Sequence, residues 1–460
     1  MSSIQRIEPP LKRAILVSYE FPPRASAQAL SAAKLAKGLA ERGWEIEVVT
    51  VLDPPTKLLD GTLLRELPDE VRVNIAYSLE PTRLAQAYSR IAKGFDGREG
   101  KAPSGEQGGW QTHESARYYT SLPRWAVQLL KAFFLPDEKI GWMPWAVREG
   151  ERIHRRRPVD VVIGDGPPYT SNSVGVRLAR RLGLPCVAVL MDPVFGCYAF
   201  PPPTPMHALF MRRFERKLSA QCNLITIATE AMREDLVARV PEADDRVMVL
   251  CNGFDPEDFD KPRHASHDGF VISYVGAFQR SITPEVFLKA LRSAAERDPG
   301  FGEDVKVRFV GPSYRPLRQT LSTLGLDAIV TETGLVSHEE AISYMRSSDI
   351  LLLVLGPEPE SRSILTTKLP EYLASGRPVL ALVPPDGVAA ETVRRCSAGE
   401  VVRPGDVEGA AQALLALHRR WTTGTLPSPD EKAVSEFSWA VQIDRLDSRM
   451  KSLRGGQRLS

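Results

Sequence analysis

The segment Ser363–Gly387 reads SILTTKLPEYLASGRPVLALVPPDG and decides the fold. Small polar residues precede a short helical pattern, Gly376 ends that pattern, and an apolar strand from Val379 to Val383 follows at once. A glycine that stops a helix directly before an apolar strand is typical of folds in which helices cover parallel strands. The segment therefore predicts one helix–strand unit of a doubly wound α/β sheet.

The same segment predicts a site for a nucleotide-sugar. Free N–H groups and the positive dipole end at the start of a helix hold anions, which would place a diphosphate at Thr366 and Thr367. Glu371 lies in the second turn, where a carboxylate accepts hydrogen bonds from ribose hydroxyls. The alternative is an ordinary helix with a glycine stop and a solvated Glu371.

Short apolar runs alternate with amphipathic segments along the rest of the chain, which predicts buried parallel strands joined by helices. In the first half the runs are Ala14–Ser18, Ile46–Val51, Val71–Ala76, Val159–Ile163, Cys186–Leu190, Leu224–Ala228 and Val247–Leu250. In the second half they are Phe270–Val275, Val305–Val310, Ala328–Thr331, Ile350–Leu355, Val379–Val383 and Glu400–Val402.

Two complete alternating sets predict two Rossmann-like domains. A polar segment, Asp260 to Arg263, separates them, so we expect an N-terminal domain over residues 1–260 and a second domain over 261–436. Residues 437–460 are expected to form a last helix and a frayed tail.

Composition excludes several classes of function. Among 460 residues, Lys+Arg minus Asp+Glu is 59 − 57 = +2, so no global field recruits nucleic acid. Five scattered cysteines fit a reducing cytosol, and no metal site is expected, because neither an Asp-x-Asp triplet nor a His/Cys cluster stands near the end of an expected strand. His154 and His338 are expected at the surface. Without a signal core or an 18-residue apolar run, we expect a cytoplasmic chain.

Leu122–Phe134 (LPRWAVQLLKAFF) is the one segment that suggests a membrane surface. It is short and strongly apolar and carries Arg124, Trp125 and Lys131, as interfacial helices do. We expect it to hold the protein peripherally at the inner face of the cell membrane. The alternative is a helix that covers the first sheet.

Loops at strand ends are the other candidate binding residues, because ligands of open α/β sheets bind beyond the carboxyl ends of the strands. In the first half these loops contain Tyr19, Pro22, Pro23, Arg24, Asp165, Tyr169 and Asp192. In the second half they contain Gly276, Arg280, Gly334, Leu335 and Val336.

The chain resembles the retaining GT-B glycosyltransferases that build bacterial polysaccharides and glycoconjugates (family four-like). The matching stretches are ILVSYEFPP, LAKGLAERGWEIEVVT, PVDVVIGDGPPYTS, NGFDPEDF, ISYVGAF, GLVSHEEAISYMRSSDILLL and KLPEYLASGRPVLALVPPDG. The resemblance implies two Rossmann-like domains facing a central cleft, with a C-terminal helix crossing back. It also implies that the first domain takes a glycan, lipid-linked or small hydroxyl acceptor, and that the second takes the activated sugar.

The resemblance assigns roles to individual residues. Glu371 matches the second Glu of the family's paired motif, which accepts from the donor ribose, and Gly334–Val336 match the loop that reads the base. Gly276 matches the glycine that admits the diphosphate. Arg280 lies near the family's phosphate-binding cation, where a guanidinium stabilises the leaving group. A UDP-sugar is the default co-substrate.

The sequence departs from the family pattern at three places. Ser363 stands where the first Glu of the pair is expected, and Thr366 stands where a glycine is expected; Lys368 offers a phosphate ligand that offsets the loss. Arg24 follows the proline pair in place of a double glycine. Asp192 takes the place of a cleft histidine, either to orient or deprotonate an acceptor hydroxyl or simply as a turn residue before Pro193.

Two other functions stay open at this point. A nucleotide-sugar epimerase shares the two-domain fold and would act on the donor alone. A non-catalytic subunit that binds nucleotide-sugars is favoured by Ser363 and Thr366, which replace family residues.

Overall fold

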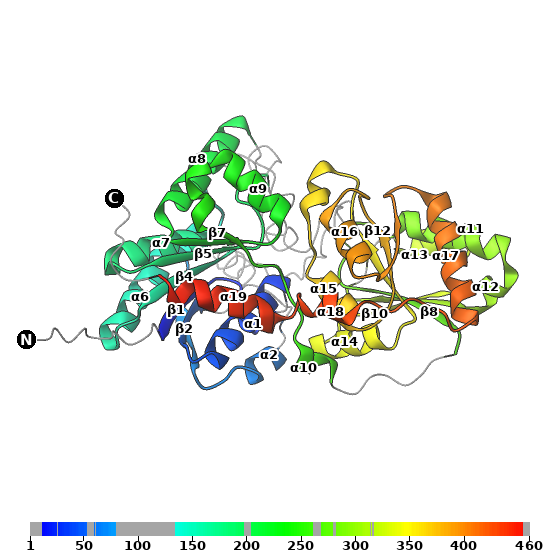
Figure 1. Ribbon diagram of the computed structural model, residues 1–460, viewed down its shortest axis with the longest axis horizontal. Coiled ribbons are helices and arrows are strands. Elements are labelled where there is room, and N and C mark those ends of the chain that lie inside the picture. The colour runs from blue at the N-terminus through cyan, green and yellow to red at the C-terminus, as the bar shows by residue number, and fades with distance from the viewer. Residues whose placement is uncertain are drawn as a thin grey trace, which may run out of the picture. The chain divides into compact units, whose positions relative to one another are not determined.

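The computed structural model describes residues 12–24, 26–52, 59, 61–79, 134–196, 204–260, 268–278, 282–312, 314 and 317–453 (Figure 1). The chain divides into two units. The described residues up to Leu250 and those from Ile443 onward form the first unit, and Cys251–Gln442 belong to the second.

The first unit is built on a seven-stranded parallel sheet with the strand order β3-β2-β1-β4-β5-β6-β7. The strands are β1 Arg13–Ser18, β2 Glu45–Val51, β3 Val71–Ala76, β4 Val161–Gly166, β5 Cys186–Leu190, β6 Leu224–Ile227 and β7 Val247–Val249. The strands β1, β4 and β5 are buried along their whole length. Asp165 lies in β4 and not, as expected, in the loop after it, because the end of this strand pairs with β1 and β5. The edge strand β3 is partly exposed.

Helices connect these strands. They are α1 Ala27–Glu41, α2 Thr62–Arg65, η1 Ile140–Trp142, α6 Met143–Arg156, α7 Thr170–Leu182, α8 Pro205–Gln221, α9 Glu230–Arg239 and η2 Pro241–Arg246. Ser26, Thr204 and Thr229 cap α1, α8 and α9, because each hydroxyl accepts a hydrogen bond from a backbone N–H of the first turn.

The second unit is built on a six-stranded parallel sheet with the order β10-β9-β8-β11-β12-β13. The strands are β8 Phe270–Val275, β9 Val305–Val310, β10 Val330–Gly334, β11 Ile350–Val354, β12 Val379–Leu382 and β13 Gly399–Val402. The helices are α10 Pro256–Phe259, α11 Glu285–Arg297, α12 Pro299–Asp304, α13 Leu317–Leu324, α14 His338–Arg346, η3 Pro359–Ser363, α15 Lys368–Ala374, α16 Val388–Arg395, α17 Val407–Thr422 and α18 Glu431–Ser435. Both strand orders are those of doubly wound folds, which confirms the predicted fold class.

The segment 251–260 belongs to the second unit, whereas we expected the first domain to extend to residue 260. The reason is backbone pairing: Phe254 N–H donates to the carbonyl of Phe437 at 3.1 Å, and Trp439 N–H donates to the carbonyl of Phe254 at 2.9 Å. No local sequence signal reveals this long-range pairing.

The last helix, α19 Trp439–Lys451, returns to the first unit, as expected. Its Ile443 lies so close to α1 that a Cβ on Gly38 would stand 2.9 Å from Cγ1 of Ile443. Asp447 accepts a hydrogen bond from the indole Nε1 of Trp44 at 2.7 Å. Among the described helices none is long and apolar enough to cross a bilayer.

Candidate functional site

Lys368 and Gly276 form the centre of the candidate donor site in the second unit. The ammonium group of Lys368 donates to the hydroxyl of Tyr274 at 2.6 Å and lies 4.1 Å from the centroid of that ring. Gly276 follows β8 with φ +127°, and a Cβ there would stand 2.4 Å from Cε of Lys368. Only glycine therefore fits both this backbone conformation and the space that Lys368 occupies.

The helix α15 is fixed against the end of β8 by Tyr372. The N–H of Val275 donates to the Tyr372 hydroxyl at 2.9 Å, and the side chains of Tyr372 and Leu369 are fully buried. This buried contact places Lys368, the first residue of α15, directly beside the carboxyl end of β8.

Burial lowers the pKa of Lys368 to about 7, although nearby Glu371 acts in the opposite direction. At neutral pH the ammonium group is therefore only partly populated. A bound phosphate restores the positive charge, since an opposite charge at short range favours the protonated form. The site is thus suited to a ligand that brings its own negative charge.

Glu371 lies one turn further along α15, with a side chain that is 12% exposed. Its Oε1 lies 4.0 Å from Nε2 of His338, and the same nitrogen lies 3.2 Å from Oδ2 of Asp258. The expectation that His338 is a surface residue is wrong: the first turn of α14 brings it beside Glu371, and its side chain is only 14% exposed. His154 is also engaged, because its Nδ1 accepts from the N–H of Val159 at 3.2 Å.

Three strand ends meet beside Lys368. The N–H of Gly311, after β9, donates to the carbonyl of Gly334 at 3.0 Å, and a Cβ on Gly311 would stand 2.5 Å from the carbonyl oxygen of Gly276. Leu335 follows and is 51% exposed. The capping box of Ser337 and Glu340 then starts α14. The expected base-reading loop Gly334–Val336 is therefore at the same sheet edge as Gly276.

The polar residues that precede α15 differ in their hydrogen bonds. Thr367 is the N-cap residue of α15 and makes no capping bond through its side chain, while the Ser363 hydroxyl donates to the carbonyl of Glu360 at 3.0 Å. The Thr366 hydroxyl is buried and has no hydrogen-bond partner among the described residues. Arg280 lies outside the described residues.

In the first unit, β1 and β4 bring Ser18 and Asp165 side by side. The Ser18 hydroxyl donates to Asp165 at 2.8 Å, and the Gln28 amide donates to the same carboxyl at 2.9 Å. Asp165 is 1% exposed, and burial raises its pKa to about 7. The two carboxyl oxygens of Asp165 thus join the ends of β1 and β4 to the first turn of α1.

Further residues that we expected on the acceptor side lie in the loop that follows β1. Tyr19 is fully buried with its ring edge-on to Trp142 at 5.3 Å, and Pro22 is buried while Pro23 is half-buried. Arg24 is 8% exposed and pairs with Glu20. These side chains shape the loop after β1.

Tyr169 and Asp192 connect the next two strand ends. The Tyr169 hydroxyl donates to the carbonyl of Pro193 at 2.8 Å, which joins the loop after β4 to the loop after β5. Asp192 lies in the second loop, is half-buried, and has a pKa raised to about 6 by that burial. A carboxylate that titrates near neutral pH is suited to proton transfer.

Asp137 also lies at this edge of the first sheet, although no sequence motif indicates it. It accepts hydrogen bonds from the N–H and the hydroxyl of Thr170, at 2.8 and 2.7 Å, and from the N–H of Lys139 at 3.0 Å. Burial raises its pKa. Its partner Thr170 starts α7, so only the tertiary structure brings the two together.

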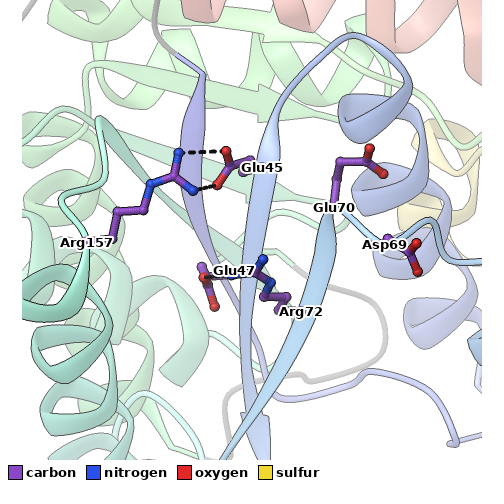
Figure 2. Close-up of a pocket in the computed structure, with 6 residues that line it drawn as sticks. All are labelled: Glu45, Glu47, Asp69, Glu70, Arg72 and Arg157. Atoms are coloured by element: carbon purple, nitrogen blue, oxygen red, sulfur yellow. Dashed lines mark hydrogen bonds and ion pairs between the residues drawn. The ribbon is translucent and has the colours of Figure 1, made fainter.

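A hollow of about 260 Å³ lies at the opposite, amino-terminal edge of the first sheet (Figure 2). Its lining includes Glu45, Glu70 and Arg157, and Figure 2 shows Arg157 pointing at Glu45, with 2.7 Å between Nη2 and Oε1. Its two arginines, Arg72 and Arg157, pair with Glu47 and Glu45, and the hollow lies away from the strand ends at which such sheets bind ligands. We therefore assign it to stability.

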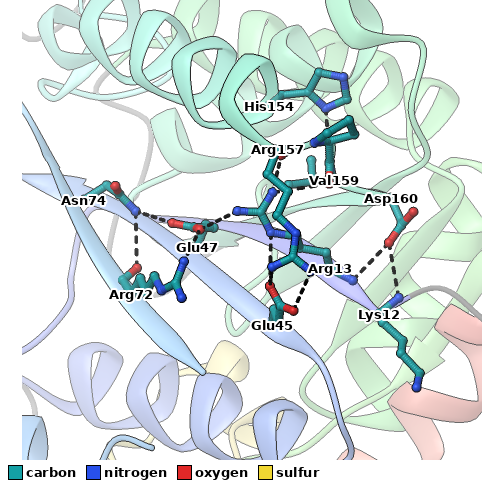
Figure 3. A network of polar contacts seen from close by, with 11 residues as sticks. Lys12, Arg13, Glu45, Glu47, Arg72, Asn74, His154, Arg157, Val159 and Asp160 are labelled. Carbon is teal, nitrogen blue, oxygen red and sulfur yellow. Dashed lines mark hydrogen bonds and ion pairs between the residues drawn. The ribbon is translucent and has the colours of Figure 1, made fainter. Parts of the chain in front are cut away.

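Figure 3 shows the network behind that hollow, in which Arg13 pairs with Glu47 at 2.6 Å. Arg13 is 6% exposed and Glu47 7%. Asn74 donates to the other oxygen of Glu47 at 2.8 Å, and Asp160 accepts from the N–H of Arg13 at 3.0 Å. The network ties β1, β2, β3 and the start of β4 together.

Comparison with known proteins follows the same division of the chain. Residues 27–253 match the family model described as "Glycosyl transferase 4-like domain", and residues 269–420 match "Glycosyl transferases group 1". D-inositol 3-phosphate glycosyltransferase 1 of Catenulispora acidiphila is 25% identical over 343 residues, which is 69% of this chain and 78% of the relative. The putative teichuronic acid biosynthesis glycosyltransferase TuaH of Bacillus subtilis is 23% identical over 36% of this chain and 42% of its own length.

Among solved structures, HepE of Anabaena in complex with UDP and glucose superposes with a TM-score of 0.61 at 16% identity and covers 96% of this chain and 100% of its own. WaaG, a glycosyltransferase involved in lipopolysaccharide biosynthesis, has a TM-score of 0.52 at 14% identity, with 97% of this chain and 96% of its own covered. These likenesses agree with the two parallel sheets. The chain belongs to the GT-B glycosyltransferases, with a glycosyl transferase 4-like domain followed by a group 1 domain.

Proposed function

We propose that this glycosyltransferase moves a sugar from a nucleoside-diphosphate sugar, UDP-sugar first among them, to a hydroxyl acceptor with retention of anomeric configuration. The expected setting is polysaccharide or glycoconjugate biosynthesis. The observation that supports the proposal most is the position of Lys368, a half-buried lysine beside Gly276 with Glu371 one turn away. This arrangement offers a cation for a diphosphate and a carboxylate for a ribose.

In the proposed reaction the bond between the anomeric carbon and the distal phosphate breaks, and the diphosphate leaves with added negative charge. Lys368 would stabilise this charge through its ammonium group, and the buried Thr366 hydroxyl offers a neutral donor nearby. The acceptor oxygen would bond to the anomeric carbon on the face that the phosphate leaves, and the departing phosphate would take the acceptor's proton. The protein then contributes positioning and electrostatics.

Glu371→Gln should weaken binding of the donor by about tenfold, because a neutral amide accepts ribose hydroxyls less strongly than a carboxylate does. Calorimetric titration with a nucleoside diphosphate measures the change. Glu391→Gln on the exposed side of α16 is the matched control and should leave the Kd unchanged. An unchanged Kd in Glu371→Gln would refute the ribose assignment.

Asp192 is the proposed acceptor-side carboxylate, and its raised pKa of about 6 predicts a pH dependence. Below that pH the carboxyl is protonated and no longer holds the acceptor hydroxyl as a charged hydrogen-bond acceptor, so log kcat/KM should fall by about one for each pH unit. Asp192→Asn should remove this acidic limb. If log kcat/KM of the variant still falls over the same acidic pH range, another group titrates there and Asp192 is only a turn residue.

Three expectations remain proposals. Arg280 is proposed as a second phosphate cation, and Leu122–Phe134 as a peripheral membrane contact, with Phe134 its only described residue. The absence of a metal requirement is the third.

Incubation with the donor alone distinguishes the transferase from an epimerase, because a transferase shows at most slow hydrolysis, whereas an epimerase converts the sugar without an acceptor.

A further inference from the structure

Residues of α7 and α8, the two helices labelled in Figure 1, and of the start of α6 line a groove of about 480 Å³ that is both apolar and basic. The apolar side chains are Met143, Val176, Phe214 and Leu218. The basic side chains are Arg177, Arg180, Arg181 and Lys217. No residue in this described lining is acidic. The groove therefore has an excess of positive charge over an apolar floor.

The exposed side of α8 continues this pattern beyond the groove. Met206 is 73% exposed and Leu209 is 59% exposed. Arg213 and Arg216 are exposed and follow on the same side of the helix, since residues three and four positions apart are neighbours there. One continuous stripe thus runs from large apolar side chains to cations.

The acidic residues near the stripe do not neutralise it. Glu215 points inward, with a side chain that is 3% exposed, and pairs with Arg239 at 2.7 Å. Glu151 pairs with Arg181 at 2.7 Å and leaves the other arginines of α7 unaffected. The outward cations of α7 and α8 are thus available to an anionic partner.

We propose that this α7–α8 surface docks on the anionic phospholipid headgroups of a bilayer. Arg177, Arg180, Arg213 and Arg216 would contact lipid phosphates, and Met206 and Leu209 would enter the boundary between headgroups and acyl chains. Interfacial helices combine these two contacts, and each cation near an anionic surface adds to the attraction. A soluble polyanion would engage the arginines but leave Met206 and Leu209 in water, so the apolar half of the stripe favours a membrane. The proposal does not depend on the donor site.

Co-sedimentation of the full chain with vesicles of phosphatidylcholine, with and without about 30% phosphatidylglycerol, tests this surface. The wild-type chain should bind the anionic vesicles in about 0.15 M salt and bind neutral vesicles much more weakly. A fourfold variant should lower the partition coefficient of the protein between water and anionic vesicles by at least about tenfold, because each lost cation weakens the attraction. It combines Arg177→Gln, Arg180→Gln, Arg213→Gln and Arg216→Gln.

The control removes the same number of positive charges from exposed positions of the second unit. It combines Lys289→Gln, Lys306→Gln, Arg318→Gln and Lys432→Gln. This variant should keep most of the wild-type binding. Equal losses in both variants would show a net-charge effect and overturn the proposal, as would wild-type binding by the α7–α8 variant.

The apolar half of the stripe is tested by Met206→Ser/Leu209→Ser, which should lower binding to anionic vesicles by at least about threefold. Both side chains are exposed, so circular dichroism and the thermal midpoint should stay unchanged. The same variant should bind soluble polyphosphate as the wild type does. If vesicle binding is also unchanged, the surface recognises polyanions and the membrane proposal is wrong.

Discussion

Replacement of Lys368 by Met should lower kcat by roughly 100-fold, as expected for the loss of one preorganised charge-stabilising group. The side chain lies beside Gly276 and is held by the Tyr274 hydroxyl at 2.6 Å, which is where we propose that the leaving phosphate binds. Single-turnover kinetics with the donor and acceptor found by screening measures the change. Lys432→Met, an exposed lysine of the same unit, is the control. A kcat within about threefold of wild type would reject the role of Lys368.

The same lysine predicts how donor binding varies with pH. With a pKa of about 7, Lys368 is a cation below that pH and loses its proton as the pH rises. The Kd for a nucleoside diphosphate should therefore increase above pH 7, by up to about tenfold per pH unit. Lys368→Arg keeps its charge and should flatten this dependence, so a steep profile in that variant would assign the titration to another group.

Unfolding tests this pKa without any ligand. Because the folded protein releases the Lys368 proton near pH 7 and the unfolded chain near the ordinary value of 10.5, the unfolded chain binds more protons between these values. The contribution of Lys368 to stability therefore increases as the pH rises through this window. Lys368→Met should remove that increase, which urea unfolding at several pH values measures.

Arg13→Ala should destabilise the first unit by about 3 kcal/mol, because removal of one partner leaves the buried Glu47 carboxylate without its closest cation. The value is at the low end for a broken buried pair, since Asn74 still donates to Glu47 and Arg72 lies 3.9 Å away. The thermal midpoint of this unit should fall by roughly 6 to 10 °C.

A second variant separates the lost pair from the lost volume. Arg13→Leu/Glu47→Leu removes both charges and should recover a large part of the stability, since apolar pairs replace buried ion pairs at little cost. Arg155→Ala, whose side chain is 69% exposed, should change the free energy of unfolding by less than about 0.5 kcal/mol. If Arg13→Ala behaves like Arg155→Ala, the network of Figure 3 does not stabilise the fold.

The sheets could be predicted from the sequence because buried parallel strands are apolar over their whole length. Both sheets contain strands near the expected places, with two shifts. β10 starts at Val330 and not at Ala328, since the chain still turns at Leu326–Ile329. β4 spans Val161–Gly166 and not 159–163, because its last residues pair with β1 and β5. The end of the first unit was misplaced because the pairing of Phe254 with Phe437 is not visible in local sequence. Local hydrophobic patterns determine the helices and strands, whereas the boundary between the two units depends on contacts between residues far apart in the sequence.

The residues proposed for the donor site in α15 lie in one continuous segment, so the sequence alone predicts that they are close together. Hydrogen-bond partners could not be predicted in this way: Tyr274 lies 94 residues from Lys368, and Ser18 lies 147 residues from Asp165. His338 was misassigned for the same reason, since its neighbours Asp258 and Glu371 lie in other elements. Side-chain type and spacing therefore predict where the candidate site lies, while the tertiary fold determines the hydrogen-bond partners and the pKa values.

Titration calorimetry with UDP, GDP, ADP and dTDP tests most directly whether the loop before α15 holds a nucleotide. We expect at least one of these diphosphates to bind the wild-type chain, and Lys368→Gln/Glu371→Gln to weaken that binding by at least about tenfold. Lys432→Gln/Glu391→Gln, which alters the same charges at exposed positions, should bind as the wild type does. Equal affinity in wild type and Lys368→Gln/Glu371→Gln, or no binding of any diphosphate, would contradict the assignment of Thr366–Glu371 as the donor site.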